Sequence, residues 1–520
     1  METISKLPVR ILTGLLGDYG VHHIVVSSGS RCAPLTVAFN RAGCFCLHTV
    51  IDERSAGFVA LGMAIALGEP VAMVCTSGTA PLNYAPALAE AYYRRVPLIA
   101  VTADRPQWWV GQREGQTIRQ AGALDAVVRC SVDIPCSEDA DSLRQTNRQI
   151  NMALSEAMGR IPGPVHINVR LDAPLTAVAP ADLQPIWRRI VRVQGKLAVP
   201  ADICLPVADP AGVLVLVGDN SFDAATLDTF KALAAKPGVV VLAEAQANIP
   251  GAWRPAWFEE AFANASFPVP DIVVSLGGAL VSNALKQWLR SIGVPHVSIG
   301  YDDEPVDTFG SLVMSLDVSP EVGLSWLMAQ LQSCAGDSYK ERCAALSQPK
   351  AGQWPCMSAI AGRFRSGTVH ISNGTAIRAA QHVAWADGVR IECNRGVSGI
   401  EGSTSTAIGA AMLSSAPTLL VSGDMSAAYD VGAFALKDIP PTFRMVVLDN
   451  GGGDIFRRIP TTSGLAELDE LFVMPPRLPL RELAMAYGFR YFEYCPAEES
   501  FPDEFFAPSG TPAILRAILR

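Results

Sequence analysis

The sequence predicts an α/β protein made of three doubly wound parallel-sheet domains. Near-continuous apolar runs such as VAMVCTS and PLIAVTA are each followed by a helical pattern, which is typical of parallel strands covered by helices on both faces. This alternation recurs in three blocks along 520 residues, a length that suits two to four domains. Hydrophobic residues make up 49% and charged residues 18%, so the chain can form large packed cores.

The first block, residues 1–180, has strand-like runs at HHIVVSS, VAMVCTS, PLIAVTA and PVHINVR, and a helix through ALAEAYYRR. The second block, residues 206–335, carries GVLVLVGDN, GVVVLAEA, DIVVSLGGAL and HVSIGYDD, again a doubly wound pattern. The third block, residues 357–520, carries VRIECNR, PTLLVSGD and FRMVVLDN. We expect linkers at 175–205, which is rich in Pro, Ala and basic residues, and at 336–356.

Composition and missing motifs exclude several classes of protein. The net charge of −9 and the pI of 5.4 argue against a nucleic acid or an anionic membrane as partner. The twelve cysteines include no C-x-x-C, so neither a zinc site nor a disulfide scaffold is expected. The second block lacks G-x-G-x-x-G and the whole chain lacks G-x-x-x-x-G-K-[ST], which disfavours a nucleotide-binding protein.

Targeting signals are also absent from the sequence. The N-terminus METISKLPVRILTG has no apolar core of a signal peptide. The uncharged stretch 402–423 is interrupted by Ser, Thr and Pro and makes a poor transmembrane candidate. We therefore expect a cytoplasmic protein with no membrane partner.

Asp424 and Asn450 follow two apolar strand-like runs, PTLLVSGD and FRMVVLDN, and are 26 positions apart. At adjacent strand ends, their carboxylate and carboxamide would be hard oxygen ligands, and a backbone carbonyl at Gly452 would be a third. Two oxygens of a diphosphate and one water would then complete a six-coordinate Mg²⁺ site. Two ordinary strand-to-loop turns would use the same residue types, so the residues alone leave both interpretations open.

Glu53 lies between an apolar run, CFCLHTVI, and a helix pattern rich in small residues. A carboxyl group at such a junction is partly buried and can share a proton with a ring nitrogen. The alternative is helix capping, because acidic residues favour the first turn of a helix, and Asp52 would serve that role equally well.

Together, Glu53, Asp424 and Asn450 resemble the signature of the thiamine diphosphate enzymes. Longer segments narrow the resemblance to the 2-succinyl-5-enolpyruvyl-6-hydroxy-3-cyclohexene-1-carboxylate (SEPHCHC) synthases of menaquinone biosynthesis. These segments are SSGSRCAPLTVAF, DERSAGFVALGMA, CTSGTAPLNYAPALAEAYYRRVPLIAVTADRP, GQTIRQ, GPVHINV, NRGVSGIEGSTSTAIG, GDMSAAYD and NGGGDIF. The resemblance spans nearly the whole chain, and TADRP and DERSAG are its most specific parts.

The resemblance implies the thiamine diphosphate-binding fold, with residues 1–180 as the pyrimidine-binding domain, 206–335 as the central domain and 357–520 as the diphosphate-binding domain. It also implies that the cofactor lies between the first domain of one subunit and the third domain of another. A homodimer is then the minimum active unit, and a homotetramer is compatible with it.

The resemblance also implies roles in the cofactor site. Glu53 would be the catalytic residue that activates the aminopyrimidine, and Ile400 would bend the cofactor, although an ordinary core isoleucine is equally consistent with the sequence. The implied ligands of Mg²⁺ (or Mn²⁺, which takes the same oxygen ligands) are Asp424, Asn450 and Gly452. Further implied cofactor contacts are Arg395, Ser398 and Ser426.

The implied activity is that of a transferase, which decarboxylates 2-oxoglutarate and adds the succinyl semialdehyde unit to isochorismate, giving SEPHCHC and CO₂. Both substrates carry two carboxylates, so bidentate arginines are expected. The implied isochorismate positions are Ser30, Arg31, Arg105 and Gln116, and Arg378 is the implied oxoglutarate position. Ile455, Phe456 and Ile459 would form an apolar wall over the reaction centre. A solvated surface charge is the alternative for each arginine, and it stays open for Arg378.

Several positions depart from the patterns of the superfamily or the family. Met425 follows the expected metal ligand where the broad superfamily often has glycine, and Asp449 precedes Asn450 where an asparagine is usual. Gly115 and Gly374 replace polar residues. Asn283 and Ala284 replace a basic pair, for which Lys286 is the candidate substitute. These differences concern carboxylate recognition and leave the reaction class unchanged.

The sequence disfavours three other functions. Another thiamine enzyme, such as an acetolactate-synthase-like carboligase or a 2-oxoacid decarboxylase, is disfavoured by TADRP and the arginine-rich substrate positions. A non-catalytic homologue is disfavoured because Glu53, Asp424 and Asn450 are all present. A nucleotide-binding α/β protein is disfavoured by the missing fingerprints.

Overall fold

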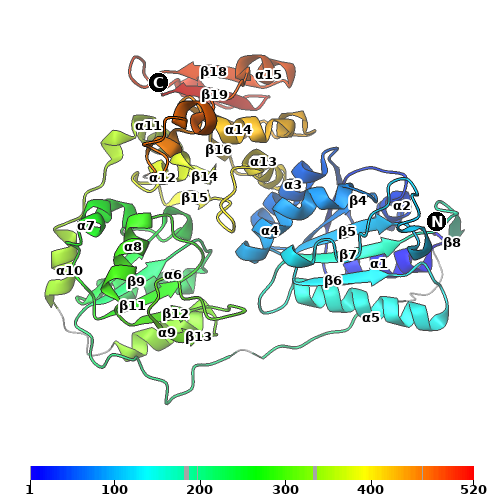
Figure 1. Ribbon diagram of the computed structural model, residues 1–520, viewed down its shortest axis with the longest axis horizontal. Coiled ribbons are helices and arrows are strands. Elements are labelled where there is room, and N and C mark those ends of the chain that lie inside the picture. The colour runs from blue at the N-terminus through cyan, green and yellow to red at the C-terminus, as the bar shows by residue number, and fades with distance from the viewer. Residues whose placement is uncertain (1, 181–186, 196, 332–336, 460, 520) are drawn as a thin grey trace.

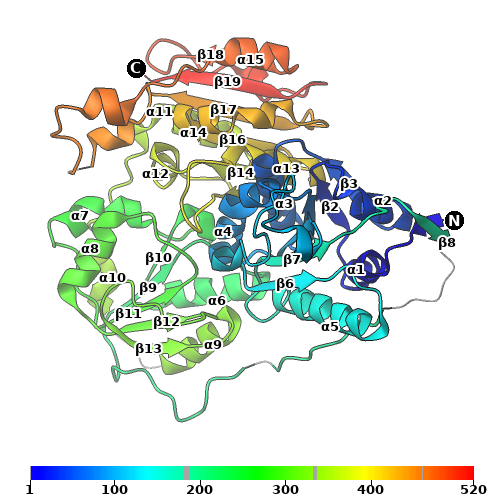
Figure 2. The same ribbon diagram turned by 45° about the vertical axis from the view of Figure 1, so that its right-hand side comes forward.

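Three parallel β-sheets with helices packed against both faces form the body of the molecule (Figures 1 and 2). This computed structural model describes residues 2–180, 187–195, 197–331, 337–459 and 461–519. The sheets follow one another along the chain, and we name the parts that contain them the first, central and third units. The expected fold class is confirmed, whereas the functional division into pyrimidine-binding, central and diphosphate-binding domains stays a prediction.

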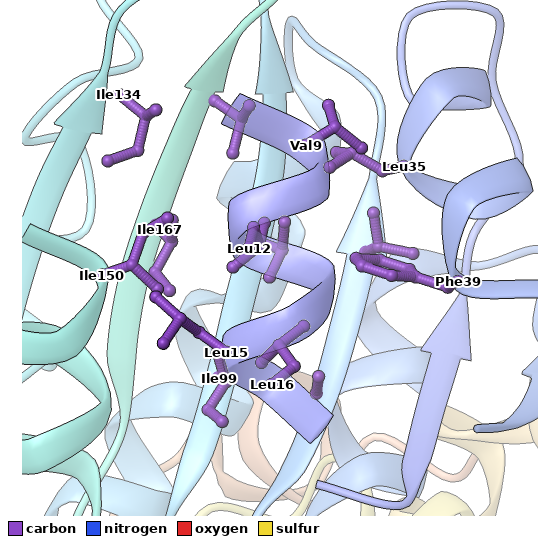
Figure 3. Packing of buried hydrophobic residues seen from close by; sticks show 14 of the residues in the cluster. Val9, Leu12, Leu15, Leu16, Leu35, Phe39, Ile99, Ile134, Ile150 and Ile167 are labelled. Atoms are coloured by element: carbon purple, nitrogen blue, oxygen red, sulfur yellow. The ribbon is translucent and has the colours of Figure 1, made fainter. Parts of the chain in front are cut away.

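The first unit contains a parallel sheet of six strands. The strands are β2 His23–Val26, β3 Cys46–Thr49, β4 Val71–Cys75, β5 Leu98–Asp104, β6 Cys130–Ile134 and β7 Val165–Arg170, and the helices are α1 Leu7–Asp18, α2 Ala33–Ala42, α3 Glu53–Leu67, α4 Ala85–Arg94 and α5 Ala140–Ala157. The strand order is β3-β2-β4-β5-β7-β6. On one face, Val9, Leu12 and Leu16 of α1 pack against apolar side chains of the sheet (Figure 3). α3 and α4 cover the opposite face, so the central strands are buried on both sides.

A small antiparallel sheet pairs β1 (Glu2–Ile4) with β8 (Val178–Pro180). The expected linker at 175–205 therefore begins with a strand, and that part of the prediction is wrong. The partner strand lies at the other end of the unit, so no local pattern marks the pairing. Residues 181–186 and 196 of this range lie outside the described residues, and its described remainder contains no helix or strand.

The central unit contains a parallel sheet of five strands. The strands are β9 Val213–Val217, β10 Val239–Ala243, β11 Ile272–Leu276, β12 His296–Ile299 and β13 Leu312–Leu316, and the helices are α6 Ala224–Ala235, α7 Glu259–Ala263, α8 Asn283–Ile292, α9 Pro320–Gln330 and α10 Asp337–Ala344. The strand order is β10-β9-β11-β12-β13. α10 lies within residues 336–356, where a linker was expected, so the linker prediction is wrong for residues 337–344. Its sequence is mostly polar, but Tyr339 and Cys343, four residues apart, anchor it in the core of the central unit.

The third unit contains a second six-stranded parallel sheet. The strands are β14 Ser366–Ile371, β15 Gly388–Glu392, β16 Thr418–Gly423, β17 Phe443–Asp449, β18 Arg490–Tyr494 and β19 Ala513–Ile518, and the helices are α11 Pro355–Arg363, α12 Thr375–Ala380, α13 Ser403–Leu413, α14 Asp424–Tyr429 and α15 Leu480–Ala486. The strand order is β15-β14-β16-β17-β19-β18.

Short helical turns connect these elements. The 3₁₀ turns are η1 Ala80–Tyr84, η2 Gln107–Trp109, η3 Asp125–Val127, η4 Ala245–Ala247, η5 Pro255–Phe258, η6 Ala351–Gln353, η7 Val431–Ala435, η8 Asp454–Arg457 and η10 Asp503–Phe505, and η9 Leu468–Val473 is a π-helical turn. No helix in the described ranges is long and apolar enough to cross a membrane.

The topology places two crevices where ligands usually bind. In the first unit, successive strands run to opposite sides of β2, so the strand order reverses between β2 and β4. In the third unit, the order reverses in the same way between β14 and β16. Open α/β sheets bind ligands outside the carboxyl ends of the strands at such points. The two units meet through α3 and α13, which lie side by side and are buried along most of their length (Figures 1 and 2).

Candidate cofactor and substrate site

The expected metal ligands lie where β16 and β17 end side by side. These strands pair in parallel, with Gly423 opposite Leu448. Asp424 follows β16 directly, and Asn450 follows β17 directly. Their placement at adjacent strand ends is therefore confirmed, and their role as ligands stays a prediction.

The backbone after β17 turns back onto the carboxylate of Asp424. Oδ2 accepts hydrogen bonds from the N–H of Gly452 at 2.7 Å and of Gly451 at 3.1 Å, and Oδ1 accepts one from the N–H of Met425 at 2.7 Å. Gly452 has φ +110°, and a Cβ there would stand 2.2 Å from the carbonyl oxygen of Val473, so the turn requires glycine. The turn brings the third expected ligand beside the first.

The carboxyl group of Asp424 is buried, and burial disfavours its ionised form. The residue is 4% exposed. Burial raises the pKa of its carboxyl group, and the nearby Asp449 adds to the rise, while the backbone N–H groups oppose it. A divalent cation would offset both effects. Carboxylate, carboxamide and carbonyl oxygens are the donors that Mg²⁺ or Mn²⁺ takes. Within the described ranges, no group of three or more His, Cys, Asp or Glu is placed to hold a metal ion.

Asn373 holds both ends of a loop at residues 394–400, which carries three of the expected cofactor contacts. Its Nδ2 donates to the carbonyl oxygens of Asn394 at 2.6 Å and Gly399 at 2.7 Å. Arg395 Nη1 donates to Asn373 Oδ1 at 3.0 Å, which fixes the direction of the guanidinium. The loop is thereby tied to the end of β14, at the crevice of the third unit.

Ser426 ties the same loop to the helix that begins with Asp424. Its Oγ donates to the carbonyl oxygen of Ile400 at 2.5 Å. Ser398, between these anchors, has φ +62°. Arg395, Ser398 and Ile400 thus share one anchored loop, which contacts Ser426 two residues after Asp424. A hydrogen bond donated by Ser426 to the cofactor would require its hydroxyl to turn away from Ile400.

Glu53 is the first residue of α3 and does not cap it. The N-cap is Asp52, whose carboxylate accepts hydrogen bonds from the N–H groups of Arg54 at 2.9 Å and Ser55 at 3.4 Å. Glu53 is half-buried near the ends of β2 and β4, where its charge contributes to raised pKa values of the Cys32 and Cys75 thiols, after the larger effect of burial. Glu53 is therefore free for another role at the crevice of the first unit.

The start of α3 also meets the third unit of the same chain. Arg54 Nη2 donates to the carbonyl oxygen of Tyr429 at 3.2 Å, and its guanidinium lies 5.0 Å from the centre of the Tyr429 ring. Tyr429 ends α14, the helix that begins with Asp424.

Arg31 and Arg105 lie near each other at the carboxyl ends of strands in the first sheet. Burial lowers the pKa of Arg31, and the positive charge of Arg105 lowers it further, so the two guanidinium groups share one electrostatic neighbourhood. Arg31 Nη1 donates to the carbonyl oxygen of Leu171 at 2.9 Å. Arg105 Nη1 lies 3.1 Å from Glu114 Oε1, a contact that an incoming carboxylate would compete with.

Ser30 and Gln116 lie on exposed loops of the same unit. Ser30 precedes Arg31 after β2, and Gln116 follows the loop whose Gly115 carbonyl accepts from Arg105 Nε at 3.1 Å. Gln116 has φ +55° and lies close to Gly78, which follows β4. The expected isochorismate residues therefore converge on one crevice.

A second basic cluster lies between the central and third units. It adjoins a cavity of about 210 Å³. Its lining includes Glu244, Glu259, Asn283, Arg378, Ile455 and Arg458. Burial lowers the pKa of Arg378, and the charge of Arg395 lowers it further. Arg378 is therefore half-buried beside a second cation, which favours binding rather than the solvated-charge alternative.

Several positions that depart from the family pattern lie at or beside this cavity. Gly374 has φ +94°, a conformation that disfavours serine, and its carbonyl accepts from Arg378 Nη1 at 2.7 Å. Asn283 begins α8 on the cavity wall, and Ala284 packs on the core of the central unit. Burial and the positive charge of Arg395 lower the pKa of Lys286, so this ammonium group belongs to the same basic cluster as Arg378 and Arg395. Nothing in the structure explains Gly115.

Sequence reasoning missed two acids that line this cavity, the fully buried Glu244 and the half-buried Glu259. Glu244 follows β10 and is fully buried, and its Oε1 accepts from the N–H groups of Val281 at 2.8 Å and Ser282 at 3.4 Å. Burial raises the pKa values of both Glu244 and Glu259. The run GVVVLAE, an acid at a strand end, is the signal that could have identified Glu244.

The expected apolar wall is partly assembled. Ile455 lines the cavity, and Phe456 packs edge-on against Phe472 with ring centres 5.7 Å apart. Ile459 is half-buried just beyond η8. Arg31 and Arg105 lie on the first unit, whereas Arg378 lines the cavity between the central and third units, so the two basic clusters are separate within one chain.

Comparison with known proteins agrees with this geometry. Residues 9–123 match the family model described as "Thiamine pyrophosphate enzyme, N-terminal TPP binding domain". The chain is 35% identical to the 2-succinyl-5-enolpyruvyl-6-hydroxy-3-cyclohexene-1-carboxylate synthase of Porphyromonas gingivalis, with 98% of this chain and 94% of the relative covered. Proteins of the same name from Desulfotalea psychrophila (33% identity, 96% of each chain) and Flavobacterium psychrophilum (34%, covering 94% and 91%) are also similar.

Fold, strand-end residues and the matching domain model together define a thiamine diphosphate-dependent enzyme. The relatives, matched over nearly their whole length, narrow this class. The chain belongs to the family of SEPHCHC synthases, transferases of menaquinone biosynthesis.

Proposed function

We propose that the chain decarboxylates 2-oxoglutarate and adds the remaining four-carbon unit to isochorismate, giving SEPHCHC and CO₂, with thiamine diphosphate and Mg²⁺ (or Mn²⁺). One C–C bond of 2-oxoglutarate breaks, one C–C bond to isochorismate forms, and a proton is taken up. The observation that carries the proposal is the oxygen set of Asp424, Asn450 and Gly452 at adjacent strand ends, in a chain with relatives of this name.

When bound, thiamine diphosphate supplies the carbanion chemistry that releases CO₂ and makes the new bond. Asp424, Asn450 and the Gly452 carbonyl would hold the metal and, through it, the diphosphate. Glu53 would hold the proton shared with the pyrimidine ring, and Ile400 would support the bent cofactor from the loop that Asn373 and Ser426 fix.

Two separate basic clusters suit two substrates that carry two carboxylates each. Arg31 and Arg105, with Ser30 and Gln116, would bind isochorismate, because paired guanidinium groups match carboxylates bidentately. Arg378, together with Arg395 and Lys286, would bind 2-oxoglutarate beside the cavity. Ile455, Phe456 and Ile459 would keep water from the reacting atoms.

The active unit in this proposal is a homodimer, alone or within a homotetramer, located in the cytoplasm. The cofactor would then bind between the first unit of one subunit and the third unit of its partner. Light scattering coupled to size exclusion, at several protein concentrations, distinguishes monomer, dimer and tetramer. A fully active monomer would contradict this part of the proposal.

The test of the reaction is an assay with purified protein, thiamine diphosphate, Mg²⁺ and both substrates. We expect loss of isochorismate absorbance only when every component is present, and a product of the mass of SEPHCHC. An Asp424→Asn variant, with the same shape but no charge, should need far more Mg²⁺. Decarboxylation of 2-oxoglutarate with isochorismate untouched would support a simple decarboxylase, and reaction of pyruvate alone would support another carboligase.

A further inference from the structure

α4 joins all three units through its last turn. It lies on the side of the first unit that faces the other two (Figures 1 and 2). Arg94, its last residue, is ion-paired with Asp219 of the central unit at 2.9 Å and with Glu392 of the third unit at 2.8 Å. These three side chains are almost fully buried, so the end of α4 is fixed relative to both neighbours.

Glu90, one helical turn before Arg94, points its carboxylate at the 394–400 loop. Oε1 accepts a hydrogen bond from the N–H of Gly396 and Oε2 accepts one from the N–H of Val397, both at 2.8 Å. Glu90 is only 1% exposed. A carboxylate that receives two backbone N–H groups forms charge-assisted bonds, which are about twice as strong as neutral ones.

The backbone of the loop also touches α4 directly. A Cβ on Gly396 would stand 2.6 Å from the carbonyl oxygen of Glu90, so glycine is required for this approach. Within the third unit, Asn373 and Ser426 hold the loop at Asn394, Gly399 and Ile400. Glu90, which belongs to the first unit, fixes the turn between these points through its two hydrogen bonds.

The burial of Glu90 is not needed for the packing of α4. Ala87, Leu88 and Ala91 already provide its apolar contacts with the core. Burial raises the pKa of Glu90, whereas the charge of Arg94 and the two N–H groups lower it. Burying the ionised carboxylate therefore costs free energy, which these partners offset in part. Such a carboxylate is retained where its hydrogen bonds define a structure.

We propose that Glu90 is a positioning residue, which fixes the 394–400 loop in the shape that presents Arg395, Ser398 and Ile400 to the cofactor. This inference rests on the proposed function, because those three residues are assigned to the cofactor site there. Glu90 does not touch the reacting atoms itself. It acts through the two backbone N–H groups of the loop.

The test compares Glu90→Gln with the wild type in the full-length protein. Glutamine keeps the size of the side chain but faces one N–H with its own NH₂ group. We expect exchange of the Gly396 and Val397 amide hydrogens, followed by hydrogen–deuterium exchange, to accelerate about tenfold or more. The dissociation constant of thiamine diphosphate, titrated with Mg²⁺ by circular dichroism, should rise by about tenfold or more. The KM for isochorismate should stay unchanged.

Glu156→Gln is the matched control, since Glu156 of α5 forms an ion pair with Arg192 at 2.5 Å away from the loop. It should change neither the exchange of the loop nor the affinity for the cofactor. Gly396→Ala serves as a second variant should Glu90→Gln fail to fold, because the new Cβ pushes the loop from α4 while the carboxylate stays. It should reproduce both changes.

Unchanged amide exchange at residues 396–397 in either folded variant would overturn the proposal. So would a lower melting temperature with an unchanged cofactor dissociation constant, which is the result of a purely structural role. A wild-type protein that binds no thiamine diphosphate would overturn the proposed function instead. The exchange comparison would then still decide whether Glu90 fixes the loop.

Discussion

Gly62 of α3 lies against the backbone of Thr406 in α13, so closely that a Cβ on Gly62 would stand 1.9 Å from the Thr406 carbonyl oxygen. The contact is reciprocal, because a Cβ on Gly409 would stand 2.2 Å from the carbonyl oxygen of Val59. The two helices therefore touch through their backbones, and this contact joins the first unit to the third. Glu53 begins α3 and the 394–400 loop lies shortly before α13, so both are next to this helix pair.

Gly409→Ala should destabilise the protein, because the added methyl group forces two backbones apart. Overpacking of this kind costs about 1–3 kcal/mol, and here the obstacle is a carbonyl group that cannot rotate away. Gly362→Ala in α11 is the matched control. A Cβ there meets nothing within 4 Å, and alanine favours a helix by roughly 0.5–1 kcal/mol. Thermal melts of both variants would decide, and equal melting temperatures would contradict the packing described.

Glu53→Gln should lower kcat by about 100-fold or more, the range of lost acid–base catalysis. Its affinity for thiamine diphosphate with Mg²⁺ should stay near the wild-type value, because the metal ligands are on the third unit. Asp52→Asn is the control, since asparagine caps a helix as well as aspartate does. Near-wild-type turnover by Glu53→Gln would refute the role of Glu53.

Arg105→Ala should raise the KM for isochorismate by about 10- to 100-fold, as expected for the loss of charged hydrogen bonds. The KM for 2-oxoglutarate should change little, because the Arg378 cluster lies between other units. Steady-state kinetics with each substrate varied in turn measures both. Arg144→Ala, which removes an exposed ion pair with Asp141, is the control. Equal effects on both KM values would contradict two separate carboxylate clusters.

The free energy of unfolding of Asp430→Asn, relative to that of the wild type, should increase as the pH rises. Burial raises the pKa of Asp430 to about 6 from an ordinary value of 3.8, against the hydrogen bonds from Ser405. Because the folded value is the higher one, the favourable contribution of the protonated group is complete below pH 3.8 and is lost as the pH rises through 6. The loss amounts to about 3 kcal/mol. The amide can still accept from Ser405 N–H and donate to its Oγ.

Asp139→Asn provides a comparison of opposite sign. Hydrogen bonds from Ser137 and Ser142 lower the pKa of the exposed Asp139, so its contribution is present at neutral pH and is lost as the pH falls. Melting temperatures of both variants and the wild type, measured from pH 2 to 8, should therefore diverge in opposite directions, for Asp430→Asn as the pH rises above 3.8 and for Asp139→Asn as it falls below 3.8. Parallel curves would contradict the assigned causes.

The strand-end residues could be predicted because their signal is local. Asp424 and Asn450 each follow an uninterrupted apolar run, and parallel strands bring such ends to one edge of a sheet. The Arg31 and Arg105 positions depended on motif resemblance, since an isolated arginine carries no comparable pattern. The helix α10 was missed because only two apolar residues anchor its polar sequence.

Contacts between distant segments could not be predicted in this way. Glu90 and Gly396 are 306 positions apart, and in the sequence Glu90 looks like an ordinary acid on an amphipathic helix. Glu244 likewise accepts hydrogen bonds from the N–H groups of Val281 and Ser282, 37 and 38 positions away in its own unit, and lies near Arg395 of the third unit. Periodicity reveals which face of an element is buried, but the identity of its partner depends on the complete fold.

The α3–α13 contact also has a consequence for the protein during its synthesis. α3 is made about 340 residues before the part of α13 that covers it. At about 5–20 residues per second, the ribosome needs roughly 20 to 70 seconds to supply that cover. Throughout this interval the face of α3 that α13 will cover stays exposed on the nascent chain, and exposed apolar surface of this kind promotes aggregation.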